Sequence, residues 1–379
     1  MKKKLSLTTQ IFFALVLAII VGVIFTKDPT FAQNYIAPFG TIFLNLIKWI
    51  VTPLVFFSLM AGVISLEDIK KVGSIGGRTV VYYLCTTAFA VTIGLLFANI
   101  FKGIFPILAT SDLSFKSDKS VSVMETLVNI FPSNFISPFA EANMLQVIVA
   151  SLLIGFAIIA VGHKAEKAVS AINVLSDICL MVMEMILKLS PIGVFCLLCP
   201  VVAVNGPAII GSLAKVLLVA YVCYIVHAVV IYSGSVSLLA KMSPIKFFKG
   251  MMPAIMFAFS SASSVGTMPL NLECTQKLGA RKELASFILP LGATINMDGT
   301  AIYQGVCSIF IASCFGISLT LPQMITIVLT ATLASIGTAG VPGAGMIMLA
   351  MVLQSVGLPV EGIALVAGVD RLFDMGRTT

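Results

Sequence analysis

The chain has 379 residues, of which 59% are hydrophobic and 10% are charged, and its net charge is +7. Soluble domains carry about 25% charged residues, so the composition excludes a water-soluble globular fold. Several apolar stretches exceed the roughly 18 residues that a helix needs to cross a bilayer, for example 80–100 and 209–240. The composition therefore predicts an all-α polytopic membrane protein.

The positive charge is grouped between the apolar stretches, which is typical of cytoplasmic loops and needs no nucleic-acid partner. Basic residues occur at the N-terminus, after the second, fourth and sixth predicted spans, and before the seventh: Lys2–Lys4, Lys70, Lys71, Arg78, Lys164, Lys167, Lys241, Lys246, Lys249, Lys277, Arg281 and Lys282. A signal peptide is the alternative interpretation of the N-terminus, but the apolar run is long for one. We expect a multi-pass protein of the inner (plasma) membrane, surrounded by lipid, with a cytoplasmic N-terminus.

Hydropathy predicts six membrane-spanning helices before residue 242. They lie at about 8–26, 37–65, 74–101, 144–162, 167–204 and 208–241, with a longer external segment at about 102–142. Cys196 and Cys199 have CxxC spacing, but no second pair or histidine lies near them, so we interpret them as packing residues. His227 is isolated within an apolar span, and we interpret it in the same way.

Beyond residue 242 the chain becomes rich in Gly, Ser, Thr and Pro while it stays apolar, and one pattern occurs twice. Ser264–Pro269 is similar to 335–342, and both turn-rich segments lie between short apolar arms, at about 245–277 and 320–355. Irregular backbone at membrane depth is tolerated where it is buried in protein or lines a cavity, which predicts two re-entrant hairpins. Since only the first has basic flanks, we expect them to enter from opposite sides, as inverted repeats.

Charged residues crowd the last predicted helix: Asp370, Arg371, Asp374 and Arg377. At about 100° per residue, Asp370, Asp374 and Arg377 fall on one side of it. A guanidinium can hold a carboxylate through two parallel hydrogen bonds, and Asp374 can accept from an ammonium, so the pair suits an acidic amino acid. Neutralisation of these charges by one another is the alternative interpretation.

The segment Asn296–Thr300 interrupts an apolar helix with poor helix formers, which predicts local unwinding. Freed carbonyls and the side-chain oxygens of Asn296 and Asp298 suit a hard cation such as Na⁺. Three hydroxyls share one face of the third span, although ordinary intrahelical hydrogen bonding explains them more simply: Tyr83, Thr86 and Thr87.

Residues 260–379 closely resemble the dicarboxylate/amino acid:cation symporter family, the glutamate transporter homologues. The resemblance is carried by Ser263-Ser264-Val265-Gly266-Thr267, by 291–300 with its Asn296-Met297-Asp298-Gly299-Thr300, by 335–345, and by Asp374-Met375-Gly376-Arg377-Thr378. It implies eight transmembrane helices plus two re-entrant hairpins, a homotrimer and elevator-like alternating access. A scaffold and trimerisation domain would comprise 1–73 and 102–206, and a transport domain would comprise 74–101 and 207–379.

The resemblance also implies roles for single residues. Arg377 would hold the substrate side-chain carboxylate, Asp374 the amino group, and seven others would complete the substrate site: Ser263, Ser264, Met297, Thr300, Val341, Gly345 and Thr378. One Na⁺ site would comprise Tyr83, Thr86, Thr87, Asn296 and Asp298. A second would comprise Thr294, Ser335, Ile336 and Thr338, and Gly292 and Asn296 would contribute to a third.

Two departures from the family pattern stand out. Ala262 occupies a position where several prokaryotic members carry arginine, while an arginine stands at Arg371 instead. The chain also stops at Thr379, within the last helix, where the family continues with further cation and substrate residues.

We therefore expect a symporter that couples Na⁺ influx to uptake of aspartate or glutamate, with Na⁺ as the transported ion and no organic cofactor. The Asn-Met-Asp-Gly form of 296–299 is typical of Na⁺-coupled members. A proton-coupled or C4-dicarboxylate symporter is the alternative within the family, and an anion channel is the alternative outside it. The sequence has no metal-ligand cluster, no activated nucleophile and no cofactor motif, so we do not expect an enzyme.

Overall fold

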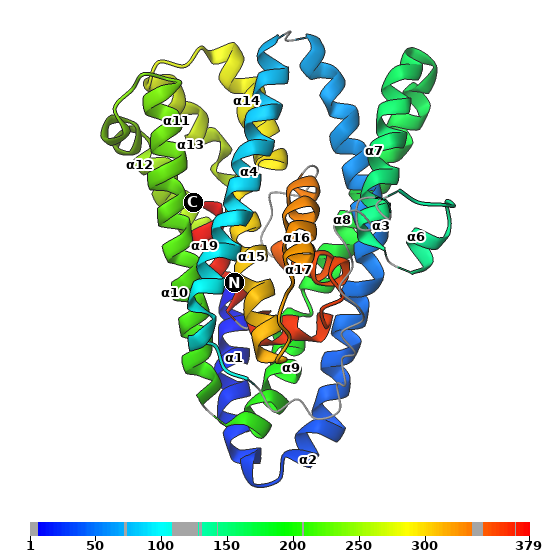
Figure 1. Cartoon of the computed structure of the whole chain (residues 1–379), viewed down its shortest axis with the longest axis vertical. Coiled ribbons are helices and arrows are strands. Elements are labelled where there is room, and N and C mark those ends of the chain that lie inside the picture. The colour runs from blue at the N-terminus through cyan, green and yellow to red at the C-terminus, as the bar shows by residue number, and fades with distance from the viewer. Residues whose placement is uncertain are drawn as a thin grey trace, which may run out of the picture.

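The computed structural model describes residues 7–71, 74–107, 128, 131–141, 143–206, 208–335, 344–367 and 369–379. Within these ranges every regular element is a helix, and the helices run mostly along the long axis of the molecule (Figure 1). By length and composition, four helical stretches of the described residues are suited to cross a membrane: Pro29–Ile64, Gly76–Ile104, Gln146–Met183 and Gly211–Leu238. The full count of eight spans and two hairpins stays a prediction.

A first group of helices packs together from the N-terminal half of the chain. It comprises α1 (Leu7–Ile24), α3 (Ala37–Lys71), α7 (Met144–Val161), α8 (Glu166–Leu187) and α9 (Ser190–Asn205), with the short η1 (Phe25–Lys27), α2 (Pro29–Phe31), η2 (Ala32–Ile36), α6 (Ser137–Ala140) and η4 (Gly162–Ala165). Helix α1 packs along α9, and α3 packs along α7, α8 and α9. Cys196 and Cys199 are buried free thiols in α9, as expected for packing residues.

The predicted single span at 167–204 is wrong in one respect, because the structure divides it into α8 and α9. The helix stops at Leu187, and Pro191 lies in the first turn of the next helix. Proline has no N–H for the helical ladder and disfavours helical geometry in the residue before it, so it begins a helix more readily than it continues one.

A second group contains most of the remaining helices. It comprises α4 (Ser74–Phe101), α10 (Ala208–His227), the π-helix η5 (Ala228–Tyr232), α11 (Ser233–Leu238), α12 (Pro244–Ser261), α13 (Ser264–Lys277), α14 (Lys282–Ile295), α15 (Asp298–Cys314), α16 (Leu321–Ala334), α17 (Ala344–Ser355) and α19 (Asp370–Thr378). Three short helices complete the described fold: η3 (Lys102–Ile104), η6 (Val360–Gly362) and α18 (Ile363–Ala367).

Paired helices lie at both places where the sequence predicts hairpins. Helix α12 packs against α13, and α16 packs against α17. Ala262 joins the first pair in the left-handed conformation, with φ of 50°. Entry of the two pairs from opposite sides of a membrane stays a prediction.

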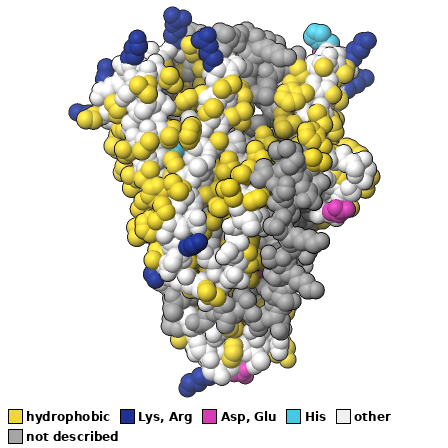
Figure 2. Space-filling view, viewed as in Figure 1, with side chains coloured by type: hydrophobic (Ala, Val, Ile, Leu, Met, Phe, Trp, Pro, Cys, Tyr) yellow, Lys and Arg dark blue, Asp and Glu magenta, His cyan; other side chains and the backbone are white. Residues whose placement is uncertain are grey.

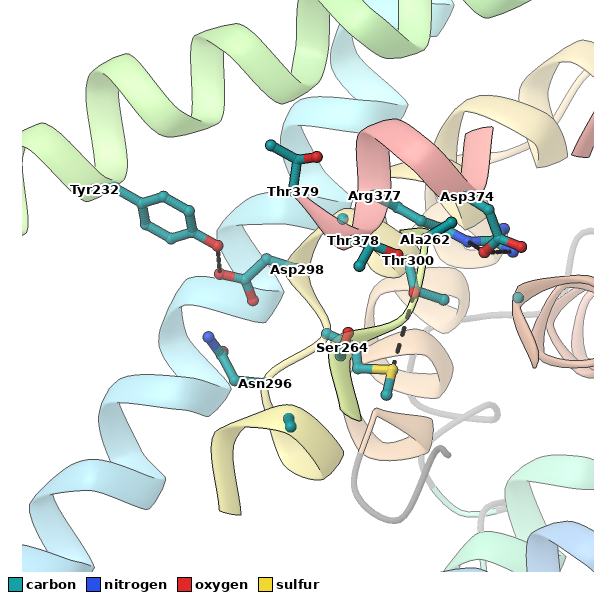
Figure 3. A pocket seen from close by; sticks show the side chains of 14 residues that line it. Tyr232, Ala262, Ser264, Asn296, Asp298, Thr300, Asp374, Arg377, Thr378 and Thr379 are labelled. Atoms are coloured by element: carbon teal, nitrogen blue, oxygen red, sulfur yellow. Dashed lines mark hydrogen bonds and ion pairs between the residues drawn. The ribbon is translucent and has the colours of Figure 1, made fainter. Parts of the chain in front are cut away.

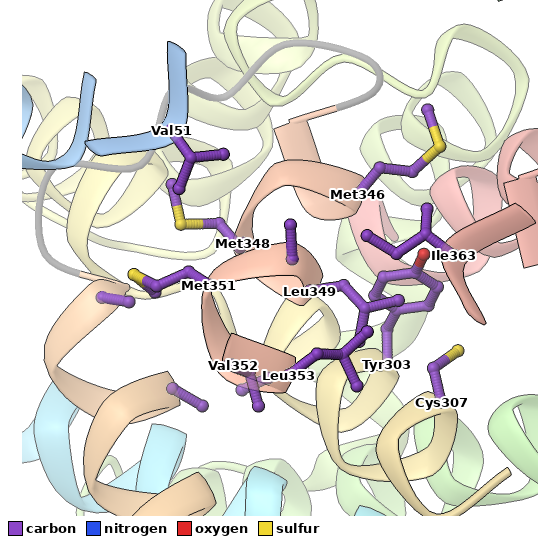
Figure 4. Close-up of a cluster of buried hydrophobic side chains, with 14 of the residues drawn as sticks. Val51, Tyr303, Cys307, Met346, Met348, Leu349, Met351, Val352, Leu353 and Ile363 are labelled. Atoms are coloured by element: carbon purple, nitrogen blue, oxygen red, sulfur yellow. The ribbon is translucent and has the colours of Figure 1, made fainter. Parts of the chain in front are cut away.

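Helices α15 and α17 form the centre of the molecule. Nearly all residues of α15 from Ala301 to Cys314 are buried, and Figure 4 shows the side chains of α17 packed among residues of α3, α15 and α18. In this central position α15 contacts the charged helix α19, and α17 contacts α3.

The outer surface is apolar along the flank and basic at one end. Figure 2 shows hydrophobic side chains over the flank and Lys and Arg side chains gathered at the upper end. Arg78, Lys164, Lys241 and Lys282 are exposed and lie at or near helix ends. Large exposed apolar areas are expected on a surface that faces lipid. The gathering of basic side chains at one end of the molecule supports the prediction that this end is cytoplasmic.

The close contact of α4 with α15 generates the first prediction. A Cβ atom on Gly305 would lie 2.9 Å from the Val91 carbonyl oxygen and 3.0 Å from the Leu95 nitrogen. Gly305→Ala therefore has to separate the two helices, and we expect a loss of about 1–3 kcal/mol of stability. The thermal midpoint of the purified protein in detergent measures it.

Gly211→Ala is the matched control, because a Cβ atom on this glycine of α10 meets nothing within 4 Å. Its midpoint should stay equal or rise slightly, since alanine favours the helix. An equal midpoint for Gly305→Ala and the wild type would contradict the close packing of α4 and α15.

Candidate functional site

The candidate site begins where the backbone breaks between α14 and α15. Helix α14 ends at Ile295 and α15 starts at Asp298, so Asn296 and Met297 are non-helical, with φ of −101° and −108°. The predicted unwinding at this segment is confirmed. The break places the side chains of Asn296 and Asp298 beside α4.

One oxygen of Asp298 faces α4. The hydroxyls of Thr87 and Thr86 donate to Asp298 Oδ1 at 2.8 and 3.4 Å. The Asn296 amide faces the same group: with its nitrogen assigned to the side of the acceptors, that nitrogen lies 3.0 Å from the same oxygen and 3.3 Å from the Tyr83 carbonyl oxygen. The Tyr83 hydroxyl instead donates to the Ile288 carbonyl oxygen at 3.1 Å, so Tyr83 borders this cluster through its backbone.

The other oxygen of Asp298 faces α10 and η5, and sequence reasoning missed both of its partners. The Tyr232 hydroxyl donates to Asp298 Oδ2 at 2.9 Å, and His227 Nε2 lies 3.1 Å from it. The side chains of His227 and Asp298 are 3% and 1% exposed. The interpretation of His227 as a packing residue was therefore wrong. The available signal in the sequence was a histidine within an apolar span, but the sequence does not indicate which residue it contacts.

Buried charges of α19 make the second cluster. Arg377 Nη1 and Nη2 donate to the two oxygens of Asp370 at 3.2 and 3.3 Å. Arg377 Nε donates to Asp374 Oδ1 at 2.6 Å, and Nη2 forms an ion pair with the same atom. The guanidinium lies over the Tyr303 ring, 4.7 Å from its centroid. The predicted shared face of Asp370, Asp374 and Arg377 is confirmed, and so is their neutralisation of one another.

Two glycines allow other helices to reach Arg377. A Cβ atom on Gly345 of α17 would collide with the Arg377 guanidinium, and one on Gly299 of α15 would collide with the Arg377 backbone. Glycine is the residue that permits such close approach. Arg371, on the same helix, donates from Nη2 to the Ser261 carbonyl oxygen at 2.8 Å and links α19 to the end of α12.

Both clusters border one cavity of about 130 Å³, shown in Figure 3. Seven of the predicted substrate residues line it: Ser264, Met297, Thr300, Gly345, Asp374, Arg377 and Thr378. Ser263 instead caps α13, where its hydroxyl accepts from Gly266 N at 3.1 Å, and Val341 lies outside the described residues. Asn296, Asp298 and Tyr232 also line the cavity, so the two clusters adjoin.

The other predicted cation residues are less well brought together. The Gly292 backbone lies against the Tyr83 hydroxyl, 2.7 Å from where a Cβ atom would stand. Thr294 is in the last turn of α14, and Ser335 follows α16, with its hydroxyl donating to the Thr332 carbonyl oxygen at 2.7 Å. Ile336 and Thr338 lie outside the described residues. The roles assigned to these five positions stay predictions.

A buried guanidinium, buried carboxylates and the break between α14 and α15 thus border one cavity within an apolar helical bundle. The chain belongs to the sodium:dicarboxylate symporter family, whose model matches residues 7–379. It is therefore an integral membrane protein of a transporter family, and the members of this family are not enzymes.

Relatives cover almost the whole chain. The chain is 36% identical to the proton/sodium-glutamate symport protein of Geobacillus stearothermophilus, over 99% of this chain and 91% of that protein. It is 35% identical to the proton/glutamate-aspartate symporter of Escherichia coli (strain K12), over 99% and 89%. It is 30% identical to the C4-dicarboxylate transport protein of Bacillus subtilis (strain 168), over 100% and 90%.

The charge cluster on α19 generates the second prediction. Asp370→Asn leaves a buried guanidinium with one carboxylate partner, and breaking a buried ion pair costs about 3–5 kcal/mol. We expect a clearly lower thermal midpoint in detergent. Glu273→Gln is the control, because it breaks an ion pair of 2.7 Å with Lys277 on the exposed surface of α13. Equal thermal midpoints for the two variants would contradict the claim that the ion pair of Asp370 with Arg377 stabilises the fold.

Proposed function

We propose that the protein is a secondary active symporter that couples Na⁺ influx to the uptake of aspartate or glutamate. The observation that carries this proposal is the buried Arg377, which borders the cavity together with Asp374. A guanidinium is suited to bind a carboxylate through two hydrogen bonds, and a buried arginine at membrane depth is a site for an anionic solute.

Binding of an acidic amino acid exchanges ion pairs instead of adding unpaired charge. Arg377 already holds Asp370 and Asp374, so an incoming carboxylate needs one edge of the guanidinium. The substrate ammonium supplies a new partner for Asp374, which can then leave Arg377 to the substrate carboxylate. Asp370 keeps its own two hydrogen bonds throughout. Because every charge stays paired, the exchange avoids the cost of an isolated buried ion.

The charge of the site supports cation coupling. The described residues at the site include the guanidinium groups of Arg371 and Arg377 and the carboxylates of Asp298, Asp370 and Asp374, which together leave one net negative charge. An acidic amino acid adds another negative charge. Cations that enter with the substrate supply the compensation that a low-dielectric environment requires.

The oxygen atoms around Asp298 Oδ1 suit Na⁺. A carboxylate, two threonine hydroxyls and the Tyr83 carbonyl converge there, and hard cations prefer oxygen ligands. The relatives named as proton/sodium-glutamate symport proteins leave both ions as candidates, and the sequence Asn296-Met297-Asp298-Gly299 favours Na⁺.

Asp374 favours an amino acid over a C4-dicarboxylate, since a dicarboxylate offers it no ammonium. The relatives support this choice, because the glutamate symport proteins are 36–37% identical and the C4-dicarboxylate proteins 30–31%.

The proposal includes elevator-like movement in a homotrimer of the plasma membrane, with the N-terminus cytoplasmic. The residues of the cavity and both clusters come from α4, α10, η5, α13–α15, α17 and α19, all in the second group of helices. A transport domain of residues 74–101 and 207–379 would therefore carry the site as one piece past a scaffold of 1–73 and 102–206.

Uptake of labelled L-aspartate into proteoliposomes tests the proposal. We expect accumulation when an inward Na⁺ gradient is imposed and none when an equal proton gradient replaces it. Uptake driven only by protons would contradict the assignment of Na⁺ as the coupling ion. No uptake of aspartate or glutamate under either gradient would contradict the proposed substrate.

A substitution at Asp374 separates the two substrate classes. Asp374→Asn removes the acceptor for an ammonium, and we expect aspartate uptake to fall by about tenfold or more, as for the loss of a charged hydrogen bond. Uptake of succinate, which has no ammonium, should not fall by this factor. Arg377→Ala should abolish uptake of either anion. Equal losses of aspartate and succinate uptake in Asp374→Asn would contradict the role given to this residue.

A further inference from the structure

Asp298 is a buried carboxylate whose partners are nearly all neutral. Among the described residues, the basic group within ion-pair distance of it is the His227 imidazole, at 3.1 Å. Its remaining partners are hydroxyls of Thr86, Thr87 and Tyr232 and the Asn296 amide. A buried carboxylate needs several hydrogen bonds to stay charged, so each of these donors matters to its position.

The two oxygens of Asp298 have partners of different kinds. Oδ1 faces threonine hydroxyls, which can donate to the carboxylate or turn their lone pairs toward a cation. Oδ2 faces the Tyr232 hydroxyl at 2.9 Å and His227 Nε2 at 3.1 Å. His227 Nδ1 is buried with no hydrogen-bond partner in the described part of the chain, which fits the tautomer with its hydrogen on Nε2. Oδ2 is thus held by two donors from one helix.

A π-helical turn brings these two donors together. His227 ends α10, and η5 spans Ala228–Tyr232, with the Ser233 N–H bonded to the Ala228 carbonyl oxygen five residues back. In an α-helix, positions five apart point about 140° away from each other, whereas the wider turn brings them nearer to one side. The rings of His227 and Tyr232 are in edge contact, with centroids 4.9 Å apart. π-turns are uncommon and occur often at functional sites.

We propose that His227 and Tyr232 are positioning residues that hold Asp298 Oδ2, so that Oδ1 is presented to the transported cation. The inference rests on the proposed function, because it assigns the role to the same Na⁺ site. A carboxylate anchored at one oxygen cannot rotate away when its threonine donors turn toward the ion. Partners of this kind orient metal ligands and raise the affinity of the site.

Three variants test whether His227 and Tyr232 position Asp298. Tyr232→Phe and His227→Phe each keep a ring and remove one donor. We expect each to raise the Na⁺ concentration for half-maximal aspartate uptake by about tenfold, the factor for the loss of a hydrogen bond to a charged group. His227→Gln keeps an N–H donor, and its half-saturating Na⁺ concentration should lie closer to that of the wild type.

Tyr224→Phe is the matched control. It removes a buried hydroxyl from α10 that has no hydrogen-bond partner within the described residues. Its Na⁺ dependence should equal that of the wild type. The KM for aspartate at saturating Na⁺ should stay unchanged in His227→Phe, His227→Gln and Tyr224→Phe, because neither His227 nor Tyr224 lines the cavity. This measurement separates a loss at the cation site from a general loss of structure.

Na⁺ titration of the thermal midpoint, with choline chloride keeping the ionic strength constant and aspartate absent, measures cation binding directly. Wild-type Na⁺ affinity in Tyr232→Phe and His227→Phe would overturn the inference while the proposed function stands. A raised KM for aspartate at saturating Na⁺ in His227→Phe would also overturn it, in favour of a general structural role. If Na⁺ changes neither the aspartate uptake nor the thermal midpoint of the wild type, both the assignment of the cation and the inference are wrong.

Discussion

The burial of Arg377 between two aspartates constrains the arrangement of the helices around it. A charge in the interior of an apolar bundle is stable only when partners surround it closely. Asp370 and Asp374 come from the same helix, but Tyr303 comes from α15 and Gly345 from α17. The helices therefore have to converge on α19, and the absence of side chains at Gly299 and Gly345 makes this convergence possible.

Asp298 places a second constraint on the same bundle, and irregular backbone satisfies it. The break after Ile295 aims this carboxylate at α4, and the π-turn after His227 aims two donors back at it. Both irregular segments belong to apolar helices, where exposed backbone groups would be costly in lipid. The break after Ile295 avoids that cost because it borders the polar cavity, and the π-turn avoids it because its backbone stays bonded within the helix, as the Ser233 N–H bond to the Ala228 carbonyl oxygen shows.

The helices and the break at Asn296 followed from the sequence because hydropathy and helix propensity are local properties. The shared face of Asp370 and Arg377 followed from helical spacing for the same reason. The division at Lys188 was missed, because the apolar composition continues through it and only Pro191 marks it. The pairing of His227 with Asp298 joins residues 71 positions apart and depends on a π-turn, and no α-helical spacing relates His227 to Tyr232.

In the proposed function, the short segment from Asn296 to Thr300 connects the cation to the substrate. Asn296 and Asp298 face the threonines of α4, while Met297, Gly299 and Thr300 line the cavity and Gly299 touches the Arg377 backbone. Because Gly299 directly follows Asp298 and lies against the Arg377 backbone, a shift of Asp298 on cation binding would be transmitted to α19. Coupling between two ligands requires that each favour the same conformation of a shared element. The segment from Asn296 to Thr300 fits this requirement in the proposed function, since Asp298 borders the proposed cation site and Thr300 lines the cavity.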